Sequence, residues 1–174
     1  MNSDGIERAL KRMAREIVER ARGGELAIVG IRRGGVHLAE RLRRDLEEAT
    51  GQELPLGTLD IALYRDDLSE RASAPVVGPT DIRFSVTGKT IVLVDDVLYT
   101  GRTVRAALDE LVDFGRPRRV LLAVLVDRGG RELPIAPDMV GARLEVPEAE
   151  QVEVQLVEAG AAEDQVIVKP RGNA

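Results

Sequence analysis

Three runs of apolar and β-branched residues stand out along the chain, and a polar loop containing glycine follows each of them. The runs cover residues 26–31, 90–94 and 120–126. Continuous apolar runs of this length are typical of parallel strands that are buried on both faces of a sheet. Apolar residues at helical spacing occupy about 4–21, 36–50 and 103–115. The pattern predicts an α/β fold with a doubly wound, mostly parallel sheet and flanking helices, in one domain covering residues 1–174.

Other parts of the chain give weaker signals. Ser3 is expected to cap the first helix. Alternating or short apolar segments predict further strands at 56–64, 143–146, 152–157 and 166–168, and Phe84-Ser85-Val86 is expected to return as one arm of a hairpin.

The most informative stretch follows the second run. Asp95 and Asp96 are expected at the end of that strand, and a short loop with Thr100, Gly101 and Thr103 leads into the next helix. Free amide groups at a helix start attract phosphate, and threonine hydroxyls donate hydrogen bonds to it. Paired carboxylates suit neighbouring hydroxyls or a divalent cation, so the junction predicts a site for a ribose 5-phosphate. The alternative is a capped helix after a core strand, with both carboxylates solvated.

A family resemblance rests on these residues and on two later motifs. The stretch VDDVLYTGRT resembles the phosphoribosyl pyrophosphate (PRPP) loop of type I phosphoribosyltransferases. Together with LYRDDLS and VDRGGRELPI it is similar to the PyrR family, bacterial uracil phosphoribosyltransferases that also regulate pyrimidine operons by binding RNA. The likeness runs from about Ile28 to Ile135. It implies transfer from PRPP to uracil, giving UMP and pyrophosphate, with Mg²⁺ held mainly by PRPP and with Asp95 and Asp96 as candidate protein ligands.

The resemblance also assigns roles to individual residues. Catalysis falls to Asp95, Asp96 and Arg65. Ribose and phosphate binding falls to Asp95, Asp96, Val97, Leu98, Tyr99, Thr100, Gly101, Arg102 and Thr103. Backbone groups near Val126, Asp127 and Arg128 would contact the base. The alternative for that last segment is a tight turn with an internal Asp–Arg pair.

A basic glycine loop, Arg32-Arg33-Gly34-Gly35, follows the first strand. Guanidinium groups clamp pyrophosphate oxygens in pairs, so Arg32, Arg33 and Gly34, with Arg65, are the candidate pyrophosphate-binding residues. The PyrR family usually has Gly-Ile-x-Thr-Arg-Gly here. In this chain Arg33 stands where threonine is expected and Gly34 where arginine is expected, so the guanidinium would come from one position earlier.

Residues 65–83 form a long connection rich in Ser, Pro and Gly. Loops of this length in compact domains are functional or disordered, and the resemblance implies a flexible hairpin that closes over the reaction. His37, the single histidine, is expected to be a helical residue without a catalytic role.

Charge is unevenly distributed along the chain. The net charge is −5, yet residues 1–44 hold 11 Lys and Arg against 6 Asp and Glu. These cations are candidate RNA contacts if they share a face; the alternative is that they are solvated faces of two helices. The candidates are Arg8, Lys11, Arg12, Arg15, Arg20, Arg22, Arg41, Arg43 and Arg44.

The remaining features narrow the class of protein. The chain has no cysteine, no signal-like start and no apolar run of about 20 residues, so a cytoplasmic protein without membrane spans is expected. Gly88-Lys89-Thr90 suggests a P-loop, but Arg83 occupies the position of the first glycine and the motif precedes a strand. The expected partners are PRPP, uracil, UMP or UTP, pyrimidine-operon leader mRNA and further copies of the chain. A purine-salvage transferase without RNA binding and an RNA-binding regulator with negligible catalysis stay open as alternatives.

Overall fold

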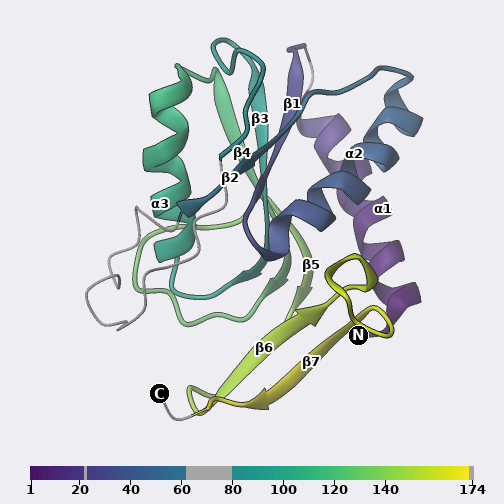
Figure 1. Ribbon diagram of the computed structural model, residues 1–174, viewed down its shortest axis with the longest axis vertical. Coiled ribbons are helices and arrows are strands. Elements are labelled where there is room, and N and C mark those ends of the chain that lie inside the picture. Colours follow the sequence, from purple (N-terminus) through teal and green to yellow (C-terminus); the bar gives the residue numbers. More distant parts are fainter. Residues whose placement is uncertain (22, 62–79, 173–174) are drawn as a thin grey trace.

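The computed structural model describes residues 1–21, 23–61 and 80–172. Its centre is a five-stranded sheet in the order β2-β1-β3-β4-β5, and every neighbouring pair of strands is parallel (Figure 1). The predicted fold class is confirmed. The strands are β1 (Leu26–Ile31), β2 (Leu56–Leu59), β3 (Thr90–Leu98), β4 (Arg119–Asp127) and β5 (Met139–Arg143).

Helices cover both faces of this sheet and divide the core into two layers. The helices α1 (Ser3–Arg20) and α2 (Gly34–Thr50) pack on one face, where Ile17 and Leu42 are fully buried. The helix α3 (Arg102–Leu111) and the short 3-10 helix η3 (Val112–Phe114) lie on the other face. Alternate residues of the central strands point into the two layers, which explains why the strands are apolar throughout.

The first helix begins one residue earlier than expected. The Asn2 side chain accepts a hydrogen bond from the Gly5 amide at 3.1 Å, so Asn2 is the N-cap and Ser3 is the first helical residue. The Ser3 prediction is wrong by one position because asparagine and serine are equally good caps and local sequence does not separate them.

A second, smaller sheet stands apart from the central one. The antiparallel pair β6 (Glu150–Gln155) and β7 (Gln165–Pro170), with the 3-10 helix η4 (Val157–Ala159) between them, is called the β6–β7 unit below. It lies beyond the start of α2 (Figure 1). Backbone hydrogen bonds join Met1 and Val166 in both directions, which fixes β7 beside the start of α1.

Two strand predictions are wrong. The strand expected at 143–146 lies instead at Met139–Arg143, where buried Met139 packs in the core and Gly141 sits against Leu125. Residues 84–86 form no strand in the part of the chain that the structure describes. Asp81 instead makes an isolated antiparallel bridge to Thr58, with two hydrogen bonds of 2.9 Å. Most of the predicted hairpin, including Arg65, falls on residues 62–79 and lies outside the described residues.

The strand order reverses between β1 and β3. The chain proceeds outward from β1 to β2 on one side and from β3 through β4 to β5 on the other. Such a switch point leaves a crevice at the carboxyl ends of the two strands, where ligands bind in open α/β sheets. The loops after β1 and β3 both open into this crevice.

Glycines allow α2 to start close to the sheet. A Cβ built on Gly35 would lie closer than 3.0 Å to the Val94 carbonyl oxygen, and one on Gly30 would lie 2.8 Å from the Val36 Cα. Real Cβ atoms essentially never approach backbone so closely, so both positions require glycine.

We predict that Gly35→Ala lowers the free energy of unfolding by about 2 kcal/mol or more, because the added methyl group overlaps backbone of β3 that cannot move away. Urea unfolding measures the change. Gly172→Ala is the matched control, since nothing lies within 4 Å of its Cβ. Equal stability of the two variants would show that the start of α2 is free to shift away from β3.

Candidate active site

The candidate site lies where β1, β3 and β4 end at the same edge of the sheet. Parallel strands bring their carboxyl ends together, so the loops at 32–35, 99–103 and 127–131 share this rim. The start of α2 is pressed directly on β3. A Cβ on Gly34 would lie closer than 3.0 Å to the Asp96 carboxylate, so glycine lets that carboxylate keep its present position.

The two aspartates lie within β3 and not beyond its end. The strand continues to Leu98 because Asp95, Val97 and Leu98 pair with β4, with Asp95 opposite Val124 and Leu98 opposite Asp127. The prediction that the strand ends at the two carboxylates is therefore wrong, and Asp95 is only 5% exposed. Asp96 is half-buried and faces the rim.

Burial controls the electrostatics of this pair. Removal from water raises the pKa of Asp95 well above its ordinary value, and the neighbouring charge of Asp96 raises it further. Short hydrogen bonds to the backbone partly offset the cost of burial. The Asp96 amide donates to the Asp95 carboxylate at 3.0 Å, and the Val97 amide donates to the Asp96 carboxylate at 2.8 Å.

The loop after β3 leads into the start of α3, where the Arg102 amide donates to the Thr100 hydroxyl at 3.3 Å. Gly101 is buried in a left-handed conformation with φ of 93°, and it precedes α3 without a side-chain cap among the described residues. No acidic residue occupies the first turn of α3. The Thr100 carbonyl accepts bonds from the Glu132 and Leu133 amides at 3.0 and 3.1 Å, which anchors the loop. Such a helix start suits a phosphate group.

The remaining residues of this predicted loop also lie at the rim. Val97 is half-buried in β3 and Leu98 is buried beneath the loop, while Tyr99 and Thr103 are half-buried. Arg102 is exposed and pairs with Glu132 at 2.7 Å.

The loop after β1 brings two arginines to the same rim. Arg32 is half-buried, and its Nε atom is buried without a hydrogen-bond partner in the described part of the chain. Arg33 is exposed and precedes α2 without capping it through its side chain. The peptide bond between the two arginines is cis.

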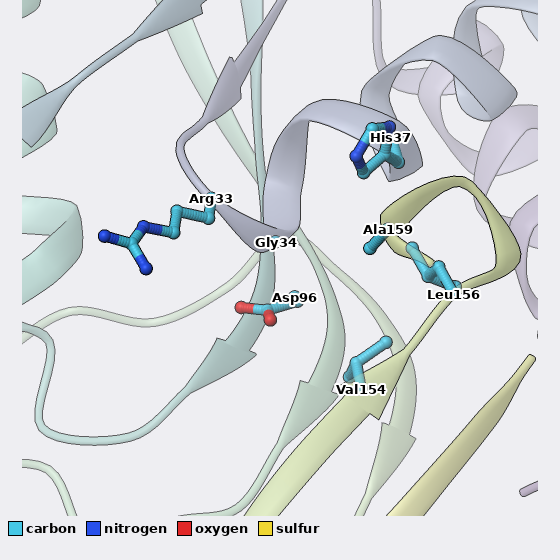
Figure 2. Close-up of a pocket in the computed structure, with 7 residues that line it drawn as sticks. All are labelled: Arg33, Gly34, His37, Asp96, Val154, Leu156 and Ala159. Carbon is cyan, nitrogen blue, oxygen red and sulfur yellow. The ribbon is translucent and has the colours of Figure 1, made fainter. Parts of the chain in front are cut away.

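A cavity of about 260 Å³ adjoins this loop (Figure 2). Arg33, Gly34 and His37 line it from the start of α2, and Asp96 lines it from β3. The β6–β7 unit closes the opposite side with Val154, Leu156 and Ala159. Sequence reasoning did not place His37 here. Its position one turn into a helix that follows a basic glycine loop was the available signal.

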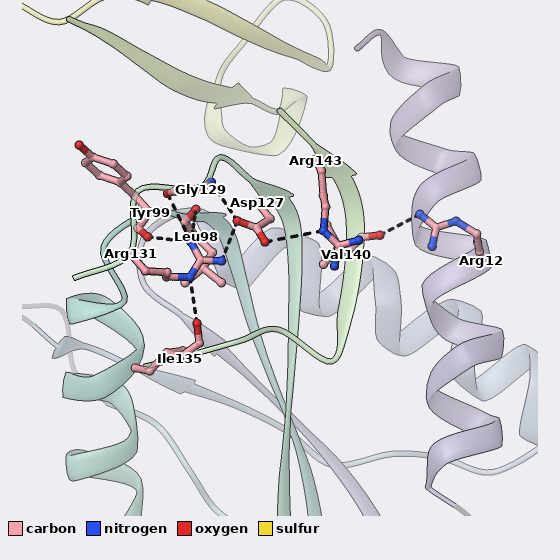
Figure 3. A network of polar contacts seen from close by, with 9 residues as sticks. All are labelled: Arg12, Leu98, Tyr99, Asp127, Gly129, Arg131, Ile135, Val140 and Arg143. Atoms are coloured by element: carbon pink, nitrogen blue, oxygen red, sulfur yellow. Dashed lines mark hydrogen bonds and ion pairs between the residues drawn. The ribbon is translucent and has the colours of Figure 1, made fainter. Parts of the chain in front are cut away.

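The loop after β4 is held by internal arginine contacts (Figure 3). Arg131 pairs with Asp127 at 2.7 Å and donates to the Tyr99 and Ile135 carbonyls at 2.7 and 2.9 Å. The internal Asp–Arg pair considered as the alternative for this segment is therefore present. Arg128 is buried, and its side chain turns away towards the β6–β7 unit, while Val126 is buried inside β4. In the backbone of this segment, the Arg128 amide donates to the Leu98 carbonyl at 3.1 Å and the Asp127 carbonyl accepts from the Leu144 amide at 2.9 Å.

Comparison with known proteins adds independent evidence. Residues 2–158 match the model of the phosphoribosyl transferase domain family. The chain is 54% identical to the "Bifunctional protein PyrR" of Pelotomaculum thermopropionicum over 97% of this chain and 94% of that protein. It is 55% identical to the protein of the same name from Thermus thermophilus, over 100% of this chain and 96% of that protein.

The chain belongs to the PyrR family of type I phosphoribosyltransferases. Solved structures agree at the level of the fold. A hypoxanthine-guanine phosphoribosyltransferase from Bacillus anthracis is similar with a TM-score of 0.67 and 18% identity, over 83% of each chain. A hypoxanthine phosphoribosyltransferase from Trypanosoma cruzi gives a TM-score of 0.68 and 22% identity, over 85% of this chain and 80% of that chain.

The first loop is the segment where this chain differs from the sequence that the resemblance to PyrR predicts. Gly34 stands where the resemblance predicts arginine, and a Cβ there would lie closer than 3.0 Å to the Asp96 side chain, so that side chain would have to shift to admit a larger residue. The guanidinium-bearing Arg33 lines the cavity from the neighbouring position, and His37 lines it from three residues further along α2. The departure is therefore compatible with a cationic rim.

The residues at the rim fit a magnesium ion that is carried by a ligand. In the described part of the chain, no three His, Cys, Asp or Glu side chains form a cluster that could hold a metal alone. Mg²⁺ often binds through one or two carboxylates while substrate phosphates and waters complete its octahedron. Asp95 and Asp96 provide that donor set.

The basic residues of the amino-terminal region are not equally available. Arg8, Lys11, Arg12, Arg15 and Arg20 are exposed on α1, and Arg44 is exposed on α2. Several have acidic neighbours, such as Glu7 for Lys11 and Glu47 for half-buried Arg43. Arg12 also donates to the Val140 and Gly141 carbonyls. Arg41 is engaged by two carboxylates inside the protein, and Arg22 lies outside the described residues.

Within the described ranges, no helix is sufficiently long and apolar to cross a membrane.

We predict that Asp95→Asn is more stable than the wild type at about pH 8 and that this advantage shrinks at about pH 4. The pKa of Asp95 is raised in the folded state, so the carboxyl ionises more readily in the unfolded chain. Folding is therefore disfavoured once the pH exceeds the ordinary pKa of an aspartate. The neutral amide removes this penalty, which is absent at low pH. Melting temperatures at both pH values measure the effect.

Asp109→Asn is the control for this prediction, because solvent screens the exposed pair of Asp109 with Arg105. An Asp95→Asn variant that is less stable at high pH would contradict the electrostatic account.

Proposed function

We propose that the protein transfers the phosphoribosyl group of PRPP to uracil, giving UMP and pyrophosphate. The observation that carries the proposal is the combination of Asp95 and Asp96 with an uncapped helix start at the switch point of the sheet. One end of that junction suits sugar hydroxyls and the other suits a phosphate. Membership of the PyrR family supports the same substrate pair.

The reaction replaces one bond at the anomeric carbon of the sugar. The bond to the pyrophosphate oxygen breaks, uracil N1 bonds to the carbon, and the N1 proton is released. Positive charge builds on the ring as the leaving group departs. Asp95 and Asp96 hold the ribose hydroxyls and stabilise that charge electrostatically, and Thr100 and Thr103 with the amides at the start of α3 hold the 5-phosphate.

The leaving group needs separate neutralisation. Arg32 and Arg33, with the Gly34 amide, face the pyrophosphate, and Arg65 is a further candidate that lies outside the described residues. Mg²⁺, when bound to PRPP, supplies charge neutralisation of the departing pyrophosphate. The protein contributes by fixing the two reactants in contact, so no covalent nucleophile is required.

We propose a second function, which is binding to pyrimidine-operon leader mRNA. This binding depends on UMP or UTP held in the same pocket. The printed name of the relatives, "Bifunctional protein", favours a second activity. Exposed cations on α1 and α2 provide candidate phosphate contacts, chiefly Arg8, Lys11, Arg15 and Arg44.

The catalytic proposal is tested with purified protein, PRPP and Mg²⁺ against uracil, hypoxanthine, guanine and adenine. We expect nucleotide to form with uracil alone, because the chain belongs to the PyrR family and not to the purine-salvage transferases. Chromatography of the radiolabelled products separates the outcomes. Product with a purine would favour the salvage transferase, and no product with any base would leave the regulator without catalysis.

The regulatory proposal predicts that affinity for a structured leader RNA rises when UMP is added and falls steeply with salt. Neutralising several phosphates makes log K fall with log salt at a slope of about −0.9 per contact on duplex DNA and about −0.7 on single strands. Filter binding at several salt concentrations measures both effects. Arg15→Gln should lower the slope. Arg116 is also exposed but lies outside α1 and α2, so Arg116→Gln should leave the slope unchanged. Binding that ignores salt and UMP would rule the proposal out.

A further inference from the structure

The β6–β7 unit forms one wall of the candidate site, yet it belongs to a different sheet. Among the described strands, none of the central five is hydrogen-bonded to β6 or β7. Its side chains Val154, Leu156 and Ala159 nevertheless close the cavity next to Gly34 and His37 (Figure 2). Something must therefore hold this wall at a fixed distance from the rim.

Arg41 makes one such connection at the η4 end of the unit. Its Nε donates to Glu158 at 2.7 Å, and a second nitrogen contacts the other oxygen of the same carboxylate. The guanidinium also donates to both oxygens of Asp164, at 2.6 and 3.0 Å. These bonds lower the pKa of Glu158 and of Asp164. The paired geometry on two carboxylates is the strongest form of arginine contact.

The Arg41 connection joins two elements that line the cavity. Arg41 lies four residues after His37, so the two side chains leave the same face of α2. Asp164 also accepts a bond from the Val157 amide at 2.9 Å, which fixes the turn between Leu156 and Ala159. One guanidinium thus links the helix that lines one side of the cavity to the turn that lines the other.

Arg128 makes a second connection at the opposite end of β6. Its side chain is only 5% exposed, and it donates to the Glu150 carbonyl at 2.9 Å and to the Val146 and Pro147 carbonyls at 3.2 Å. Its guanidinium carbon lies 4.0 Å from the centre of the Tyr99 ring. The residue therefore joins the end of β4, the loop after β3 and the start of β6.

Other contacts keep the unit attached on the far side. The Met1–Val166 backbone bonds and the burial of Leu156 and Val166 in the core do not involve either arginine. Loss of one arginine should loosen one end of the wall while the unit stays folded against α1.

We infer that Arg41 and Arg128 are positioning residues, each holding one end of the β6–β7 unit over the site. Arg41 holds the η4 end of the unit, which faces Arg33 and Gly34 across the cavity on the proposed pyrophosphate side. Arg128 sets the wall beside the loop after β4, on the base side. The kinetic part of this inference rests on the proposed transferase reaction; the structural part does not.

The test compares Arg41→Gln and Arg128→Gln with Arg116→Gln, an exposed control. We expect Arg41→Gln to raise KM for PRPP roughly tenfold and KM for uracil by less than about twofold. Arg128→Gln should show the reverse pattern. Lysine should restore most of the loss at position 128, where any donor reaches carbonyls, and little at position 41, where a planar fork meets two carboxylates.

Amide hydrogen exchange provides a readout that does not depend on catalysis. Arg41→Gln should speed exchange at 156–164, and Arg128→Gln should speed exchange at 150–152, without altering the central strands. If both variants raised both KM values equally, in step with a lower melting temperature, the arginines would be merely structural and the inference would fail. Unchanged exchange in the two segments would also overturn it. If the wild-type protein made no product but the two variants showed the expected changes in exchange, the transferase proposal would fail and the positioning role would stand.

Discussion

The approach of α2 to the carboxyl half of β3 is the contact on which the site depends. Two consecutive glycines at 34 and 35 remove the side chains that would keep the helix away from Val94 and Asp96. The amides of the first helical turn and the carboxylate of Asp96 therefore share one small space. One phosphate-bearing ligand can therefore contact amides, cations and carboxylates there at the same time.

This arrangement carries an electrostatic cost that points to its use. Asp95 is enclosed within the sheet beside a second carboxylate, so its charged form is disfavoured in the absence of a ligand. A ligand that brings hydroxyl donors, a cation or a developing positive charge relieves that cost. Stability is lowered at a residue to which the proposed reaction assigns a role, as is common for active sites. The surrounding glycines and apolar strands supply the rigidity that keeps the pair in place.

Local sequence pattern predicted the central strands and the loops that follow them, because buried parallel strands are apolar throughout and glycine marks close approaches. It placed the end of β3 too early, since pairing with β4 continues through two aspartates that no local pattern assigns to a strand. It also missed His37 as a cavity residue and the internal roles of Arg41 and Arg128. Those roles come from contacts between elements more than a hundred residues apart, or from carbonyls on a separate sheet. Hydrophobic periodicity contains no information on such pairs.

The surroundings of Tyr99 have a practical consequence. The chain has two tyrosines and no tryptophan, so its tyrosine emission, the dominant intrinsic emission, arises from Tyr64 and Tyr99. The Tyr99 ring lies 4.0 Å from the Arg128 guanidinium carbon and 5.3 Å from that of Arg171, a setting in which nearby cations polarise the ring. A Tyr64→Phe protein would therefore carry a single natural fluorophore at the rim of the site, and ligand titrations could follow its emission without an attached dye.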